Sequence, residues 1–147
     1  MIIAFIFRGG ALHAFDRTLP IVGWAGYALA CSGLVIMLVA AWTFRQHRTT
    51  LSPIQIDGVR ALVKEGVFRY SRNPMYLGMV CLTAGLSLAW VSGWGLVLSV
   101  GLLWYLDRFQ IRPEEKVLSQ QFGPAFAEYT QQTRRWFGFV KRLANKN

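Results

Sequence analysis

The sequence predicts an all-α, polytopic membrane protein, and three observations lead to that fold class. Hydrophobic residues make up 54% of the 147 residues, with six Trp and ten Phe among them. Two segments, 21–44 and 74–106, are long and apolar and contain no charged residue. Uncharged apolar runs of about 18 residues or more indicate a lipid bilayer. At this length we expect a single domain, residues 1–147.

The first run, 21–44, has the length of one membrane-spanning helix. Ahead of it, residues 1–15 contain a shorter apolar stretch, MIIAFIF, without basic residues before it. That stretch is a poor match to a cleaved signal sequence. It fits either a half-length membrane segment or a helix lying in the interface, and the residues do not choose between the two.

The second run, 74–106, is too long for a single helix. As one helix it would extend about 50 Å, against a hydrocarbon core of about 30 Å. Its middle reads WVSGWG, where Ser92, Gly93 and Gly95 favour a turn. We therefore expect two short helices, about 74–91 and 94–111, which form a hairpin in the membrane.

The remainder predicts amphipathic helices on the cytoplasmic side. Pro113 suits the first turn of a new helix, and Glu114 and Glu115 follow where the helix dipole favours carboxylates. That helix is expected to end at Phe122-Gly123, and a second helix then runs from Pro124 to about residue 133. The basic residues beyond it are expected to lie at the lipid headgroups.

The distribution of charge favours a membrane over nucleic acid as the partner of this basic chain. The net charge is +9, and 14 of the 16 basic residues follow the first apolar run, in segments 45–72 and 108–146. This is the positive-inside pattern of cytoplasmic loops, which a hairpin satisfies on both flanks. We expect an integral protein of a bacterial inner membrane, no nucleic acid partner and, since Cys31 and Cys81 lack metal-ligand spacing, no metal.

Two polar clusters are expected to meet at the cytoplasmic membrane surface. A hairpin returns its end close to its beginning, so residues before the second helix should lie near residues after the third. Each cluster also has a purely structural interpretation, as a helix cap, a complement to the helix dipole or an interfacial anchor. The first cluster contains Arg69, Tyr70, Ser71, Arg72, Asn73 and Tyr76; the second contains Arg112, Glu114 and Glu115, with Arg134 and Arg135 able to fold back onto both.

Taken in order, these residues resemble a known family. The strings GVFRYSRNPMYLG, 66–78, and EEKVLSQQFGPAFAEYTQQTRRWF, 114–137, flank the hairpin. They resemble the membrane methyltransferases related to isoprenylcysteine carboxyl methyltransferase and to phospholipid methyltransferases. The resemblance covers about residues 58–137, which it identifies as a cofactor-binding core. It is specific for the superfamily and much less so for the substrate.

The resemblance implies S-adenosyl-L-methionine as cofactor and a lipophilic, prenylated or lipid-like acceptor. The cofactor carries an ammonium, a sulfonium, a carboxylate and an adenine, so its site needs carboxylates, a cation and aromatic surface. Asn73 stands where eukaryotic members carry His, which removes an acid–base role but keeps hydrogen bonding. The cofactor-binding residues that it implies are Gly66, Tyr70, Arg72, Asn73, Tyr76, Glu114 and Glu115.

The methyl acceptor decides which residue is catalytic. A carboxylate acceptor requires only a cation to place it, for which Arg135 is the candidate. An amine acceptor requires a general base, for which Glu115 is the candidate. Two other functions stay open: an NADPH-dependent reductase related to the sterol-type membrane reductases, and a membrane interaction protein without catalysis. The oligomeric state is not indicated.

Overall fold

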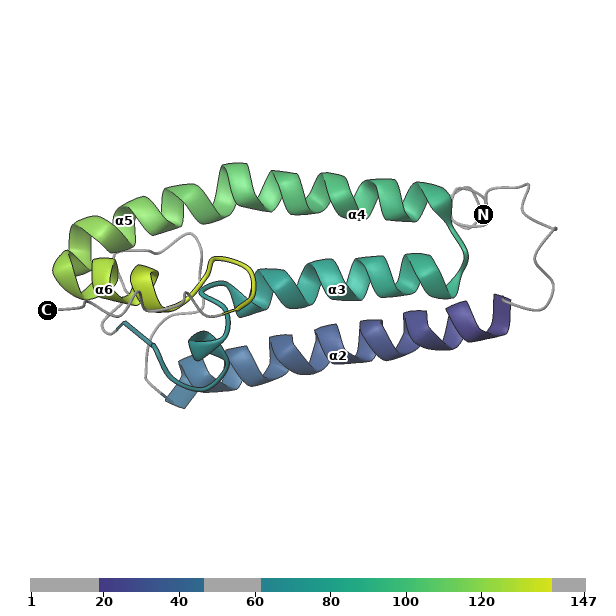
Figure 1. The fold of residues 1–147 in the computed structure, drawn as a ribbon, viewed down its shortest axis with the longest axis horizontal. Helices are drawn as coiled ribbons and strands as arrows, with labels where there is room; N and C mark the ends of the chain where they lie inside the picture. The colour runs from purple at the N-terminus through teal and green to yellow at the C-terminus, as the bar shows by residue number, and fades with distance from the viewer. Residues whose placement is uncertain (1–18, 47–61, 139–147) are drawn as a thin grey trace, which may run out of the picture.

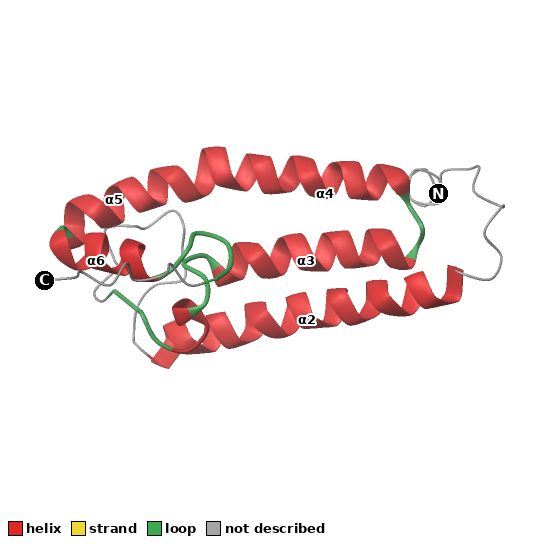
Figure 2. Ribbon diagram, in the orientation of Figure 1, coloured by secondary structure: helices red, strands yellow, loops and turns green. Residues whose placement is uncertain are grey.

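A computed structural model describes residues 19–46 and 62–138, which form helices and loops without a β-strand (Figure 2). The all-α prediction is therefore confirmed for this part of the chain. The predicted N-terminal segment 1–15, the first residues of the 58–137 core and the end of the basic tail lie outside the described residues.

Three long helices lie side by side, with α3 in the middle (Figure 1). They are α2 (Leu19–Gln46), α3 (Pro74–Ala89) and α4 (Gly93–Tyr105), close to the predicted positions. At the end where α2 finishes and α3 begins, α5 (Arg112–Phe122) continues beyond α4, and α6 (Pro124–Gln132) turns back beneath it. The predicted ends of these two helices are confirmed, because Gly123 and Pro124 separate them.

Small residues allow α2 and α3 to pack closely. These helices run antiparallel, and the backbone of Gly33 lies so near α3 that an added Cβ would be 2.6 Å from the Gly78 carbonyl oxygen. At Gly85 it would lie 2.7 Å from the carbonyl oxygen of Gly26. Both separations are shorter than van der Waals contact allows, so larger side chains would push the helices apart.

The turn between α3 and α4 differs from the prediction in its details. Val91, rather than a glycine, takes the left-handed backbone conformation, with φ of 49°. Ser92 caps α4, since its hydroxyl accepts a hydrogen bond from the Gly95 amide at 3.2 Å. Gly93 and Gly95 lie inside the helix, where Gly95 lets α4 approach Ser87 of α3. The hairpin itself is as predicted.

The expected break before Pro113 is absent. Instead α4 continues through a π-helical turn, η3 (Leu106–Ile111), directly into α5 (Figure 1). In this wider turn the amide of Arg112 bonds to the carbonyl of Asp107, five residues back. Proline lacks an amide hydrogen and crowds the preceding turn of an α-helix. The wider π turn accommodates both the missing backbone hydrogen bond and this crowding.

The loop before α3 is anchored on α2 by an apolar cluster. Phe68 of the short 3₁₀ helix η2 (Gly66–Arg69) packs against Ala40, and its ring lies 4.7 Å from that of Phe44. Val63 completes the buried group. These contacts hold segment 70–73 over the end of the bundle, where the polar residues meet.

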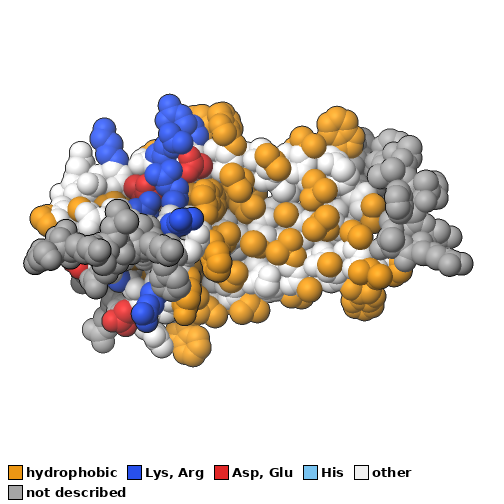
Figure 3. Space-filling view, in the orientation of Figure 1, with side chains coloured by type: hydrophobic (Ala, Val, Ile, Leu, Met, Phe, Trp, Pro, Cys, Tyr) orange, Lys and Arg blue, Asp and Glu red, His pale blue; other side chains and the backbone are white. Residues whose placement is uncertain are grey.

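Among the described helices, α2 is the one long and apolar enough to cross a bilayer, through its stretch Pro20–Gln46. The helices α3 and α4 are shorter, with 16 and 13 residues. Apolar side chains cover the visible face of the bundle, while Lys, Arg, Asp and Glu gather at the end near α5 and α6 (Figure 3). Trp24 and Trp42 of α2 are 75% and 65% exposed.

Candidate functional site

The site is built on a C-terminal strap, defined here as residues 133–138, which crosses segment 70–73. The Arg72 amide donates to the carbonyl of Arg134 at 3.0 Å, and the Gly138 amide donates to that of Tyr70 at 2.9 Å. The side-chain amide of Asn73 and the hydroxyl of Ser71 both donate to the carbonyl of Arg135, at 3.2 and 3.3 Å. The strap is therefore tied to this segment at Arg134, Arg135 and Gly138.

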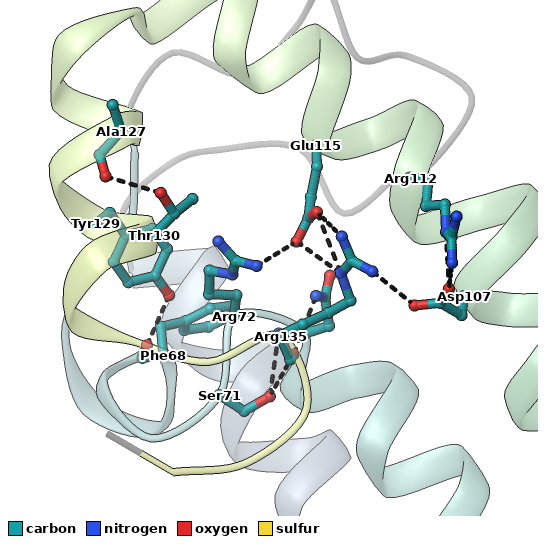
Figure 4. Close-up of polar contacts among 11 residues, drawn as sticks. Phe68, Ser71, Arg72, Asp107, Arg112, Glu115, Ala127, Tyr129, Thr130 and Arg135 are labelled. Carbon is teal, nitrogen blue, oxygen red and sulfur yellow. Dashed lines mark hydrogen bonds and ion pairs between the residues drawn. The ribbon is translucent and has the colours of Figure 1, made fainter. Parts of the chain in front are cut away.

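Helix α6 and the first residue of the strap are both bound to η2. The buried hydroxyl of Tyr129 donates to the carbonyl of Phe68 at 2.6 Å, and Thr133 donates to that of Arg69 at 3.3 Å. Burial raises the pKa of Tyr129, although the nearby cation of Arg72 opposes that shift. Tyr129 thus stays protonated and keeps its donor role (Figure 4).

Side chains from three segments form a chain of ion pairs at this end of the bundle (Figure 4). Arg135 donates from Nη2 to Glu115 Oε2 at 2.6 Å and from Nη1 to Asp107 Oδ1 at 2.9 Å. Arg72 reaches the other oxygen of Glu115 at 3.0 Å, and Arg112 reaches the other oxygen of Asp107 at 2.8 Å. Three cations thus surround two carboxylates.

The two central arginines differ in environment. The hydrogen bonds of Arg135 to Glu115 raise its pKa above the ordinary value. Burial lowers the pKa of Arg72, and the charge of Glu115 opposes this effect. Arg72 also holds its Nε buried with no hydrogen-bond partner among the described residues. An unpaired buried donor is costly, so this nitrogen opposes the stability that the ion pairs provide.

A second carboxylate lies beside the ion-pair chain. Glu114 accepts from the Tyr76 hydroxyl at 2.6 Å and from the Gln110 side-chain amide at 2.8 Å, both on Oε1. The two donors come from α3 and η3, so they orient the Glu114 carboxylate from both sides of the hairpin. The predicted approach of Tyr76 to the acidic pair is present in the structure.

Three of the predicted site residues, Gly66, Tyr70 and Asn73, take no part in the ion pairs or in the hydrogen bonds of Glu114. Gly66 lies against Thr43 of α2, and its φ of 58°, rather than close contact, is what favours glycine. Tyr70 is 49% exposed and meets the strap through its carbonyl. Asn73 faces the strap, where its amide holds the Arg135 backbone.

Sequence reasoning missed two residues of this cluster, Asp107 and Gln110. Asp107 directly follows the long uncharged run, and an ionisable residue beside such a run is itself a functional signal. Gln110 pairs with Glu114 at the ordinary helical spacing of four residues, whereas the pairing of Asp107 does not follow from that spacing. Asp107 meets Arg112 five residues later because a π turn lies between them.

Comparisons with known proteins identify the family. A family model described as phospholipid methyltransferase matches residues 21–125, well over half of the chain. The chain therefore belongs to the phospholipid methyltransferase family, whose members are associated with membranes. The match extends from the start of α2 to the start of α6, so it includes the hairpin and the acidic pair.

Curated relatives are named for a particular reaction. A protein-S-isoprenylcysteine O-methyltransferase of Saccharomyces cerevisiae is 26% identical over 126 residues, which are 86% of this chain and 53% of that protein. A probable protein-S-isoprenylcysteine O-methyltransferase of Oryza sativa subsp. indica is 27% identical over 120 residues, 82% of this chain and 63% of that one. The chain thus spans between half and two thirds of these relatives, and no solved structure matches it.

Proposed function

We propose that this protein transfers the methyl group of S-adenosyl-L-methionine to a carboxylate on a lipophilic, prenylated or lipid-like acceptor. The observation that carries this proposal is the position of Arg135, whose guanidinium is held between Glu115 and Asp107. An arginine so placed can bind a carboxylate in a defined orientation. The names of the relatives and the family membership support the reaction type.

The residues around Glu114 suit the cofactor. Tyr76 and Gln110 bind Oε1 of Glu114, so Oε2 is left for a ligand ammonium. We assign the guanidinium of Arg72 to the cofactor carboxylate and Tyr70, which is 49% exposed, to the nucleoside. When bound, S-adenosyl-L-methionine supplies an electrophilic methyl group: the acceptor oxygen forms the new C–O bond as the C–S bond breaks, leaving a neutral thioether and releasing no proton.

The ion pairs favour a carboxylate acceptor over an amine. An amine must lose a proton, and Glu115 is the candidate base. Both oxygens of Glu115 already accept from arginines, Oε1 from Arg72 and Oε2 from Arg135. With both oxygens already engaged by arginines, Glu115 is poorly placed to take a proton from an amine. A carboxylate acceptor needs no base, so Arg135 is the proposed catalytic residue and Glu115 supports it.

The same proposal places the protein across a membrane, with the site at its cytoplasmic surface. Helix α3 extends about 24 Å, and α4 with η3, 19 residues together, extends about 28 Å. These lengths approach the hydrocarbon core of about 30 Å. The exposed apolar residues of α2 and α4 would then face lipid, from which the acceptor enters.

Binding in detergent micelles tests the cofactor assignment. We expect the wild type to retain S-adenosyl-L-methionine carrying a tritiated methyl group and not NADPH. Glu114→Gln should weaken binding about tenfold or more, because a charge-assisted bond to the ammonium is lost. Glu128→Gln, the same change at an exposed position of α6, is the matched control and should bind as the wild type does.

Methyl transfer tests the acceptor class. We expect an S-prenylated N-acetylcysteine, which carries one carboxylate on a lipophilic chain, to accept tritium, and phosphatidylethanolamine, an amine, not to. Transfer to the amine alone would overturn the carboxylate assignment. NADPH binding in place of S-adenosyl-L-methionine would favour the reductase, and binding of neither would favour a non-catalytic membrane protein.

A further inference from the structure

Asp107 occupies an unusual place in this molecule. It follows 33 residues without charge, on the π turn η3, and its side chain is only 17% exposed. Its two oxygens are divided between arginines from different segments: Oδ1 accepts from Arg135 of the strap and Oδ2 from Arg112 of α5. A carboxylate this close to an apolar run is costly unless it is paired.

Asp107 and Glu115 hold Arg135 from two sides. Glu115 accepts from Nε and Nη2 of Arg135, and Asp107 accepts from Nη1. A guanidinium is planar and has five N–H groups in a rigid fork. One carboxylate orients that plane, and the second, bound to a different nitrogen, stops the group from swinging about the first. Three N–H groups carry these bonds, and two others stay for a ligand.

The π turn is what allows both carboxylates to reach the same arginine. Asp107 and Glu115 are eight residues apart, or about 2.2 turns of α-helix, which would offset their side chains by roughly a fifth of a turn. A π turn takes more residues per turn and reduces that offset. The amide of Arg112, bonded five residues back to Asp107, lies between them. Local π turns in α-helices occur frequently at functional sites.

We propose that Asp107 is a positioning residue that aims the guanidinium of Arg135 at the acceptor carboxylate. This inference rests on the proposed function, since Arg135 is the acceptor-binding cation there. Asp107 is not expected to touch the cofactor, because the groups assigned to the cofactor are those around Glu114 and Arg72. Its loss should therefore affect the acceptor and leave cofactor binding in place.

Kinetics of the full chain in micelles test the inference, with S-prenylated N-acetylcysteine as acceptor. Asp107→Asn should lower kcat/KM for the acceptor about tenfold or more, and change the Kd for S-adenosyl-L-methionine less than about twofold. Asp107→Glu, which keeps the charge, should recover part of the loss. In an Arg135→Lys background, Asp107→Asn should have little further effect, because the two residues act together. Glu128→Gln again serves as the control.

Nuclear magnetic resonance of ¹⁵N-labelled arginine gives a readout that needs no turnover. In the wild type, rotation of the Arg135 guanidinium should be slow, and Asp107→Asn should accelerate it while Glu128→Gln does not. Unchanged rotation and unchanged acceptor kinetics would overturn the inference. So would equal losses of cofactor and acceptor binding that Asp107→Glu fails to recover, because those indicate a merely structural role.

The two proposals fail in different ways. If the wild type binds no S-adenosyl-L-methionine and transfers no methyl group, the proposed function is wrong, and aiming at an acceptor is wrong with it. The rotation measurement then still decides whether Asp107 restrains Arg135. If transfer occurs but Asp107→Asn leaves it unchanged, the proposed function stands and the role of Asp107 is rejected.

Discussion

Arg135 joins the two parts of the site through different atoms. Its carbonyl accepts from Asn73 and Ser71, so its backbone is attached to the loop before α3. Its guanidinium pairs with Glu115 and Asp107, so its side chain is attached to the helix after the hairpin. One residue thereby sets the separation between the two predicted clusters. Asn73 contributes by positioning this backbone.

Tyr129 provides a test of how α6 supports the site. Tyr129→Phe removes the donor to the Phe68 carbonyl and leaves that buried oxygen unpaired, which should cost about 1–3 kcal/mol in the free energy of unfolding. Thermal unfolding in micelles measures the loss. Tyr105→Phe, at a residue 54% exposed, is the control and should change stability by less than about 0.5 kcal/mol.

Alkaline pH should reproduce the effect of that substitution. The pKa of Tyr129 is higher in the folded protein than its ordinary value of 10.0, so the unfolded chain loses this proton first. The stabilising contribution is therefore complete below about pH 10 and decreases as the pH rises above that value. Tyr129→Phe should lack this part of the alkaline decrease, and equal decreases in both proteins would contradict the assignment.

At the scale of elements, the close packing of α2 on α3 holds together the two helices to which segment 70–73 is attached. Larger residues at the seam should separate these helices. A Cβ on Gly33 would lie 2.6 Å from the Gly78 carbonyl oxygen and 2.7 Å from the Leu82 amide nitrogen. Both are backbone atoms of a packed helix, which cannot move aside as the end of a flexible side chain would.

Gly33→Ala should therefore destabilise the protein by about 1–3 kcal/mol, the usual cost of overpacking. The measurement is the unfolding midpoint in micelles. Gly101→Ala is the matched control, because a Cβ on Gly101 of α4 meets nothing within 4 Å. There the substitution should be neutral or stabilising by up to about 1 kcal/mol, since Ala favours a helix. Equal effects at both positions would exclude the close packing seen between α2 and α3.

At the scale of the whole molecule, the site exists because the chain doubles back. Its charged residues come from segments 70–73, 107–115 and 134–135, which the α3–α4 hairpin and the strap bring to one end (Figures 1 and 4). The proposed function has the acceptor enter from lipid and the cofactor from the cytoplasm, and both routes require that this end lies at one membrane surface.

Cysteine labelling tests that arrangement. In a background with Cys31→Ser and Cys81→Ser, single substitutions Glu65→Cys and Lys116→Cys place thiols at exposed positions near the site. An impermeant maleimide should label both from the same side of sealed vesicles and label Gly93→Cys, at the hairpin turn, from the other. Labelling of Glu65→Cys and Lys116→Cys from opposite sides would reject the proposed topology.

The sequence alone determined the positions of α2, α3 and α4, the hairpin and most of the groups that gather at its end. These depend on local properties: apolar run length, the φ of proline and the cost of burying charge. Thus α3 begins at Pro74, and Gly123 and Pro124 separate α5 from α6, as the residues predict.

Only the tertiary structure decided which groups pair. The residues did not predict the continuous helix through Pro113, the pairing of Asp107 with Arg135, the placement of Gly66 on α2 or the use of Asn73 by the strap. Each depends on a hydrogen-bond register or on the reach of a side chain between distant segments. Those distances are set by how the elements pack together, so they cannot be calculated from spacing along the chain.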